Sequence, residues 1–87
     1  MNSVRVRYFA ELRETLGVGE EEIPVGPEGT SLPALLEHLA GLHGEEAASA
    51  LVGPGIRLAV NGELDAGTPP HLHAGDELAF LPPVTGG

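Results

Sequence analysis

Residues 30–44 read TSLPALLEHLAGLHG, and this stretch decides the fold. Its apolar residues recur at the spacing of one face of an α-helix. They are Leu32, Leu35, Leu36, Leu39 and Leu42. A hydroxyl of Thr30 or Ser31 can accept from a free backbone N–H of the first turn, and His43-Gly44 marks the predicted end. A helix with one apolar face needs a sheet to cover that face.

Strand patterns flank the helix on both sides. Residues 3–9 alternate, with Val4, Val6 and Tyr8 on one face of the expected strand. Asn61-Gly62 is a strong signal for a tight turn, because both residues tolerate positive φ. The predicted strands are residues 3–9, 20–25, 56–60, 63–65 and 77–81, and short helical segments are predicted at 10–16 and 45–51.

This order of elements predicts the fold class. Two N-terminal strands, a crossover helix and a returning sheet give an α+β, ubiquitin-like β-grasp fold, with a mixed sheet packed on one main helix. We expect a single β-grasp domain over residues 1–81, followed by an extended, flexible C-terminal tail over residues 82–87.

The same patterns predict which side chains are buried. In the second strand Ile23 and Val25 point inward, and the acidic run Glu20–Glu22 is expected to be solvated. Leu78 and Phe80 share one side of the last strand. The two histidines of the helix, His38 and His43, are expected on or near its solvent side.

Composition excludes several classes of function. Thirteen acidic residues stand against four arginines, giving a net charge of −9, which disfavours nucleic acid and small anionic ligands. The chain has no cysteine, so a disulfide, a thiolate metal site and a cysteine nucleophile are all excluded. The sequence predicts neither a signal peptide nor a membrane-spanning run, and we expect a soluble, cytoplasmic protein with no membrane partner.

The search for catalytic motifs is negative. Gly17–Gly19 is only Gly-x-Gly and is followed by acids, and no Gly-x-Ser-x-Gly elbow occurs. His71 and His73 could face one way on an extended segment, with Asp76 as the sole candidate for a third metal ligand. We therefore expect surface histidines and no metal site.

The last six residues have the properties of a delivery arm. Pro82 and Pro83 favour an extended backbone, and Gly86 and Gly87 are thin enough to enter a narrow channel. Six residues span at most about 20 Å, at ~3.3–3.6 Å each. A frayed terminus is the alternative for two glycines alone.

The closing residues 80–87, FLPPVTGG, resemble the tail of the sulfur-carrying small subunits of molybdopterin synthases, in the MoaD/ThiS superfamily. Supporting resemblances occur along the chain, at Phe9-Ala10-Glu11-Leu12-Arg13-Glu14 with Gly17, at Leu58-Ala59-Val60-Asn61 and at Gly75-Asp76-Glu77-Leu78-Ala79-Phe80. The resemblance implies that the Gly87 carboxylate is adenylated, converted to a thiocarboxylate, and donates sulfur to cyclic pyranopterin monophosphate to form the molybdopterin dithiolene.

The resemblance also implies partners and roles. Pro82, Pro83, Val84, Thr85 and Gly86 would enter the large, catalytic synthase subunit, in a heterotetramer. An E1-like adenylating enzyme would use ATP, and a cysteine desulfurase or rhodanese type of protein would donate sulfur. The chain itself would be non-catalytic and hold no tightly bound cofactor.

Two aromatic residues are candidates for contact with a partner. Phe80, and also Phe9, could form apolar contacts, although Phe80 fits the core equally well. Three alternative functions stay open: a sulfur carrier for thiazole synthesis or tRNA thiolation, a ubiquitin-like protein modifier, and an interaction module with an inert tail.

Overall fold

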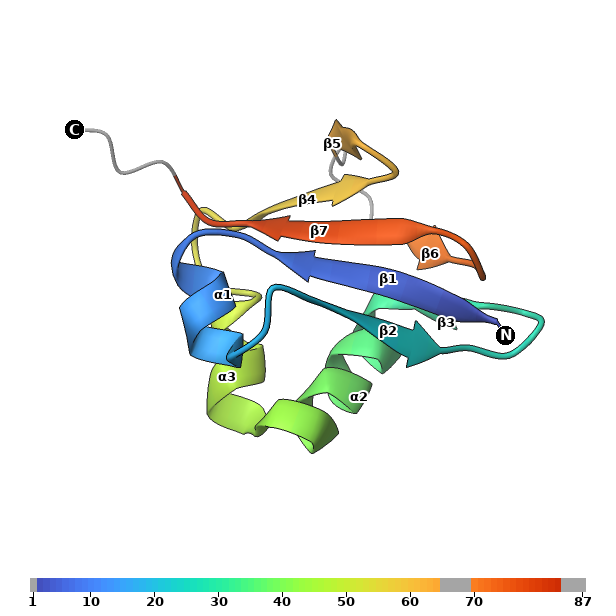
Figure 1. The fold of residues 1–87 in the computed structure, drawn as a ribbon, viewed down its shortest axis with the longest axis horizontal. Helices are drawn as coiled ribbons and strands as arrows, with labels where there is room; N and C mark the ends of the chain where they lie inside the picture. Colours follow the sequence, from blue (N-terminus) through green and yellow to red (C-terminus); the bar gives the residue numbers. More distant parts are fainter. Residues whose placement is uncertain (1, 65–69, 84–87) are drawn as a thin grey trace.

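The computed structural model describes residues 2–64 and 70–83. A mixed sheet lies across three helices, all on the same side of it (Figure 1). The strands are β1 (Ser3–Tyr8), β2 (Glu20–Pro24), β3 (Thr30–Ser31), β4 (Arg57–Val60), β5 (Glu63–Leu64), β6 (His71–Leu72) and β7 (Glu77–Leu81). The helices are α1 (Glu11–Leu16), α2 (Leu32–His43) and α3 (Glu45–Ala50). The predicted α+β, β-grasp fold with one main helix is confirmed, with boundaries shifted by a residue or so.

The main sheet has the order β2-β1-β7-β4-β5. The pairing of β1 with β7 is parallel and the other pairings are antiparallel. Alternation places one side of each strand against the helices, as predicted for β1 and β7. The core cluster consists of Val4, Val6, Tyr8, Leu12, Leu16, Ile23, Leu35, Leu39, Leu51, Leu72, Leu78 and Phe80, all at most 6% exposed.

Helix α2 begins as predicted, with the Ser31 hydroxyl accepting from the backbone N–H of Ala34. Leu35 and Leu39 are buried, and Leu32 and Leu36 pack partly against the core. Leu42 does not follow the prediction, because its side chain is 55% exposed. In the last turn of α2, His43 and not Leu42 faces the sheet, where its ring lies against Tyr8.

The sequence did not reveal a second, two-stranded sheet. In it, β3 pairs antiparallel with β6, with Thr30 opposite Leu72 and Ser31 opposite His71. Gly29 makes this approach possible: its φ is +80°, and a Cβ there would overlap the carbonyl oxygen of Leu72. Two-residue strands have too little periodicity to be recognised in a sequence.

The predicted Asn61-Gly62 turn joins β4 to β5. The register Val60 to Glu63 leaves two residues in the loop, with φ of 51° at Asn61 and 86° at Gly62, as a type I′ turn requires. The Asn61 amide also donates to the Asp76 carboxylate at 3.1 Å and accepts from the Glu77 backbone N–H at 2.9 Å. The turn is thereby tied to the start of β7.

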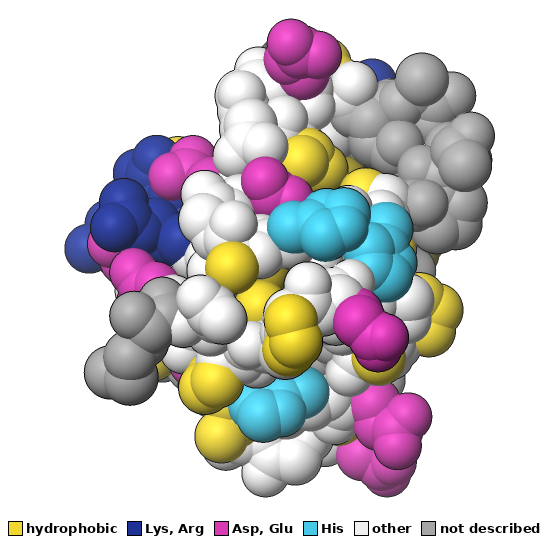
Figure 2. Space-filling view, turned by 90° about the vertical axis from the view of Figure 1, so that its right-hand side faces the viewer, with side chains coloured by type: hydrophobic (Ala, Val, Ile, Leu, Met, Phe, Trp, Pro, Cys, Tyr) yellow, Lys and Arg dark blue, Asp and Glu magenta, His cyan; other side chains and the backbone are white. Residues whose placement is uncertain are grey.

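Among the described residues, no helix covers the second face of the sheet. Arg5 and Arg7 project from it and form ion pairs at 3.4–4.0 Å with Glu20, Glu22 and Glu77. Figure 2, which views the molecule from one end of the sheet, shows arginines gathered at one edge beside acidic side chains. These exposed pairs neutralise charge locally and add little stability each.

Candidate functional site at the end of β7

Strand β7 ends at Leu81, where the predicted tail begins. Leu81 lies opposite Arg57 of β4, and Phe80 lies beside Tyr8 of β1. The chain therefore leaves the sheet from between two neighbouring strands (Figure 1). Pro82 is partly buried and Pro83 is exposed, whereas Val84, Thr85, Gly86 and Gly87 lie outside the described residues.

Gly55 contacts the base of the tail. It precedes β4, has a φ of +85°, and a Cβ on it would lie only 2.9 Å from Cβ of Pro83. The absence of a side chain thus lets Pro83 pack closely over the α3–β4 connection. The sequence Gly53-Pro54-Gly55 is typical of a turn and does not by itself indicate a contact with the tail.

The two aromatic candidates differ in their surroundings. Phe80 is 1% exposed and stacks on Tyr8 with ring centroids 6.0 Å apart, so it is a core residue and not an accessible partner contact. Phe9 follows β1 at the end where β7 also finishes, and it is partly exposed. The Arg7 guanidinium lies 5.0 Å from its ring centroid, within the range of a cation–π interaction.

Glu21 departs from the predicted solvated run. It shares the inward side of β2 with Ile23, and its Oε2 accepts from the Tyr8 hydroxyl at 2.7 Å and from His43 Nε2 at 2.6 Å. Burial, followed by the hydrogen bond to Glu21, raises the pKa of the Tyr8 phenol, which keeps it a donor. His43 is therefore not a solvent-side residue: its side chain is 15% exposed and joins the end of α2 to the sheet.

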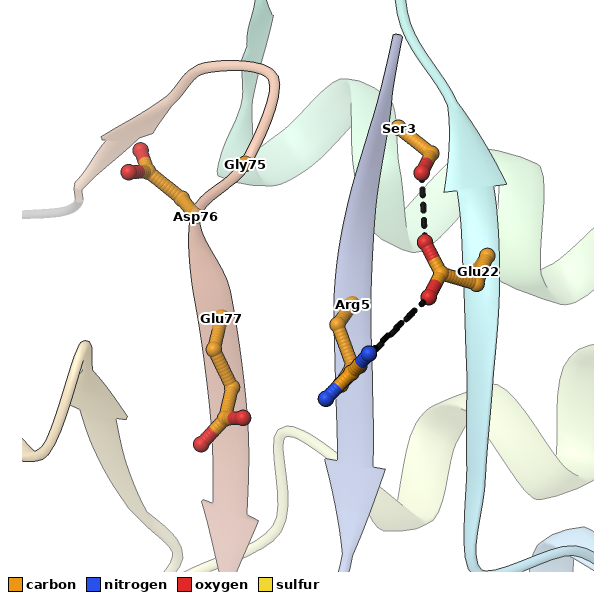
Figure 3. A pocket seen from close by; sticks show the side chains of 6 residues that line it. All are labelled: Ser3, Arg5, Glu22, Gly75, Asp76 and Glu77. Atoms are coloured by element: carbon orange, nitrogen blue, oxygen red, sulfur yellow. Dashed lines mark hydrogen bonds and ion pairs between the residues drawn. The ribbon is translucent and has the colours of Figure 1, made fainter. Parts of the chain in front are cut away.

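A cavity of 260 Å³ lies at the other end of β1 and β7 (Figure 3). Its polar groups bind one another. Ser3 and Arg5 both reach Glu22, and the hydrogen bond from Ser3 is the main cause of a lowered pKa of the Glu22 carboxyl. The backbone N–H of His73 and then the amide of Asn61 lower the pKa of Asp76. The charged side chains that line the cavity already have partners in the protein. The cavity therefore does not present an acid–base pair to a substrate.

Two other features, a metal site with three protein ligands and a membrane-spanning helix, are absent from residues 2–64 and 70–83. No three of their His, Asp or Glu side chains are arranged to hold a metal ion. Asp76, the candidate third ligand beside His71 and His73, is engaged by the His73 backbone and by Asn61. In the same ranges, no helix is long and apolar enough to cross a membrane.

Similarity to known proteins extends along nearly the whole chain. The model of the ThiS family matches residues 6–87. The molybdopterin synthase sulfur carrier subunit of Escherichia coli (strain K12) is 38% identical over 84 residues, covering 97% of this chain and 99% of that protein.

Solved structures are also similar to this chain over nearly its whole length. The crystal structure of SAMP1 from Haloferax volcanii has a TM-score of 0.76 and 33% identity, covering 98% of this chain and 99% of the other. A crystal structure of H. volcanii small archaeal modifier protein 1 has a TM-score of 0.73 and 30% identity, covering 97% and 100%.

Proposed function

Because this chain belongs to the ThiS family, we propose that it is the sulfur carrier subunit of a molybdopterin synthase and works with a catalytic subunit. The observation that carries the proposal is the 38% identity over nearly the full length of a protein of that name. The family match continues through residue 87, so the predicted tail falls within the shared pattern. As a carrier, the chain is a protein-bound reagent and not the catalyst.

The proposed reactive group is the carboxylate of Gly87. Such a group has a pKa near ~3.5, so at neutral pH it is ionised and resists nucleophiles. An E1-like partner uses ATP to form the Gly87 acyl-adenylate and releases pyrophosphate. The persulfide of a sulfur donor of the cysteine desulfurase or rhodanese type attacks the adenylate carbonyl and displaces AMP, and a thiol then reduces the resulting acyl disulfide, which leaves a thiocarboxylate on Gly87. The thiocarboxylate sulfur attacks cyclic pyranopterin monophosphate, and hydrolysis of the acyl–sulfur bond returns the Gly87 carboxylate. Two deliveries complete the dithiolene.

The net charge of the chain supports a role as sulfur carrier, with substrate binding left to the catalytic subunit. The pterin substrate carries a phosphate, and a chain with a net charge of −9 repels it. The catalytic subunit, in a proposed heterotetramer, therefore supplies the basic residues, while this chain supplies sulfur on a narrow arm. Pro82 and Pro83 give that arm a stiff base, and the contact of Pro83 with Gly55 fixes where it starts.

A reconstituted pterin assay tests the proposal. Gly86→Val and a chain with one residue added after Gly87 should both lose sulfur delivery while keeping wild-type circular dichroism. Intact mass spectrometry after incubation with activating enzyme, ATP and sulfur donor should show one oxygen replaced by one sulfur in the wild type. Full delivery by the extended chain would overturn the proposal.

Protein modification is the second candidate, because of the similarity to small archaeal modifier protein 1. In that case Gly87 would form an isopeptide bond with lysines of other proteins. The discriminating measurement uses the activated chain in a lysate: conjugates in which the Gly87 carbonyl is joined to a lysine side chain of another protein favour a modifier. Sulfur transfer to the pterin by the purified pair of subunits favours the carrier, and transfer to a thiazole precursor or to tRNA would assign a different acceptor.

A further inference from the structure

Two histidines lie against each other on the surface at β6. Leu72 is fully buried between them, and strand alternation therefore places His71 and His73 on the same, exposed side. Their ring centroids are 4.8 Å apart. Figure 2, which faces the end of the molecule that carries β6, shows two histidine side chains side by side.

Their hydrogen bonds leave one ring nitrogen of each histidine available. His71 Nε2 lies 2.8 Å from the carbonyl oxygen of Glu28, which can only accept, so Nε2 carries the proton and Nδ1 keeps its lone pair. His73 Nδ1 faces Asp76 Oδ2 at 3.9 Å, which favours the proton on Nδ1 and the lone pair on Nε2. Within the described ranges, neither His71 Nδ1 nor His73 Nε2 has a hydrogen-bond partner.

The turn formed by residues 26–29 supports both rings. Its Glu28 carbonyl orients His71, and its Gly29 lies beneath His73, where a Cβ would come within 3.1 Å of His73 Cδ2. The turn is closed by a bridge between Gly26 and Gly29 and is attached to the β3–β6 sheet. Partners that fix the tautomer and direction of an imidazole are the usual outer support of a histidine metal ligand.

The spacing suits one shared ion. Two imidazole nitrogens at ~2.0–2.1 Å from one cation, at neighbouring coordination positions, place the ring centroids about 4.5–5 Å apart. Neutral imidazole favours late first-row metals over Mg²⁺ or Ca²⁺, which prefer oxygen. The net charge of −9 also raises the local concentration of cations.

We propose that His71 and His73 form a two-histidine surface site for a late first-row divalent cation such as Zn²⁺ or Ni²⁺, completed by water. The site lies at the end of the sheet opposite the end of β7 (Figure 1). Its occupancy is therefore independent of the tail and of sulfur delivery.

Isothermal titration of the full chain with Zn²⁺, in excess Mg²⁺ to occupy carboxylates, tests this site. His71→Ala and His73→Ala should each weaken Zn²⁺ binding by about 100-fold, because each converts a chelate into a single ligand. His38→Ala is the matched control, since His38 is an exposed histidine on α2, and it should bind as the wild type does. In ¹⁵N NMR spectra, Zn²⁺ should shift the amides of residues 28–29 and 71–73.

Two results would overturn the site: equal Zn²⁺ affinity in the wild type and His71→Ala, or an equal loss in His38→Ala. Sulfur delivery by His71→Ala should match the wild type. If delivery fails in every chain while Zn²⁺ binding depends on His71 and His73, the metal site stands and the proposed carrier function does not.

Discussion

At the scale of single residues, Gly55 links the folded sheet to the proposed delivery arm. The left-handed φ of +85° suits glycine, and the 2.9 Å that would separate its Cβ from Cβ of Pro83 leaves no room for a side chain. A methyl group here would therefore act twice: it would strain the backbone and push Pro83 aside. Only the second effect concerns the tail.

We predict that Gly55→Ala lowers the free energy of unfolding by about 1 kcal/mol through backbone strain. By displacing the base of the arm, it should also slow sulfur delivery by about tenfold, since catalysis is sensitive to ångström-scale misplacement. Urea unfolding and the reconstituted pterin assay measure the two effects.

Gly75→Ala separates strain from displacement. Gly75 has a similar φ of +92°, nothing lies within 4 Å of its would-be Cβ, and it precedes the other end of β7. This variant should lose similar stability while delivering sulfur at the wild-type rate. Equal delivery by the Gly55 and Gly75 variants would show that the contact with Pro83 does not position the arm.

The exposure of single side chains could not be predicted where the sequence pattern allowed two interpretations. Glu20–Glu22 is a continuous charge run, yet alternation from Ile23 places Glu21 inward, where Tyr8 and His43 donate to it. Phe80 fits a core or an interface from its position in the sequence alone. Only the stacking on Tyr8 decides for the core, and that pairing depends on the parallel register of β1 with β7.

At the scale of elements, helix α1 begins from an unfavourable backbone conformation. Ala10 has φ 52° and ψ −128°, and Leu12 N–H donates to the Phe9 carbonyl at 3.0 Å. These are the features of a type II′ turn with Ala10 at the position that glycine dominates. The turn joins β1 directly to α1, beside the partly exposed Phe9.

We predict that Ala10→Gly raises the free energy of unfolding by about 0.5–1 kcal/mol. Relief of the positive-φ strain, worth ~1–2 kcal/mol, exceeds the extra entropy that glycine loses on folding. Chemical denaturation provides the measurement. Gly41 lies in the interior of α2 and serves as a reference. Glycine is unfavourable there, so the reverse substitution, Gly41→Ala, should raise the free energy of unfolding. A less stable Ala10→Gly protein would mean that the II′ geometry carries no strain.

Strong local periodicity made most elements predictable. The leucine stripe of α2, the alternation in β1 and β7 and the Asn61-Gly62 turn each depend on a few neighbouring residues. By contrast, β3 and β6 are two residues each and pair across about forty residues of chain. The exposure of Leu42 depends on which residue of the last turn of α2 faces the sheet, and that residue is His43. The tail motif could be recognised in the sequence. Its contact with Gly55 could not, because that contact exists only once the chain is folded.

At the scale of the whole molecule, the described helices all lie on one face of the sheet, and none of them covers the other face (Figure 1). On that open face, the register aligns Ala79 of β7, Ala59 of β4 and Leu64 of β5 across three strands. Leu81, the last residue of β7 before the tail, lies on the same face beside Arg57. Ala59 and Ala79 are only 8% and 7% exposed, so Leu64, at 57%, is the accessible apolar side chain of this row and the candidate contact for the catalytic subunit.

We predict, on the basis of the proposed carrier function, that Leu64→Glu weakens binding to the catalytic subunit by about tenfold or more. Burying a leucine side chain is worth ~1.5–3 kcal/mol, and each 1.4 kcal/mol is a factor of about ten in affinity. Leu42→Glu is the matched control, because Leu42 and Leu64 are 55% and 57% exposed but Leu42 lies on α2, behind the sheet. Calorimetric titration should find wild-type affinity for the Leu42 variant. If the two variants bind equally, docking does not use the open face, and the arm must be presented from the helical side.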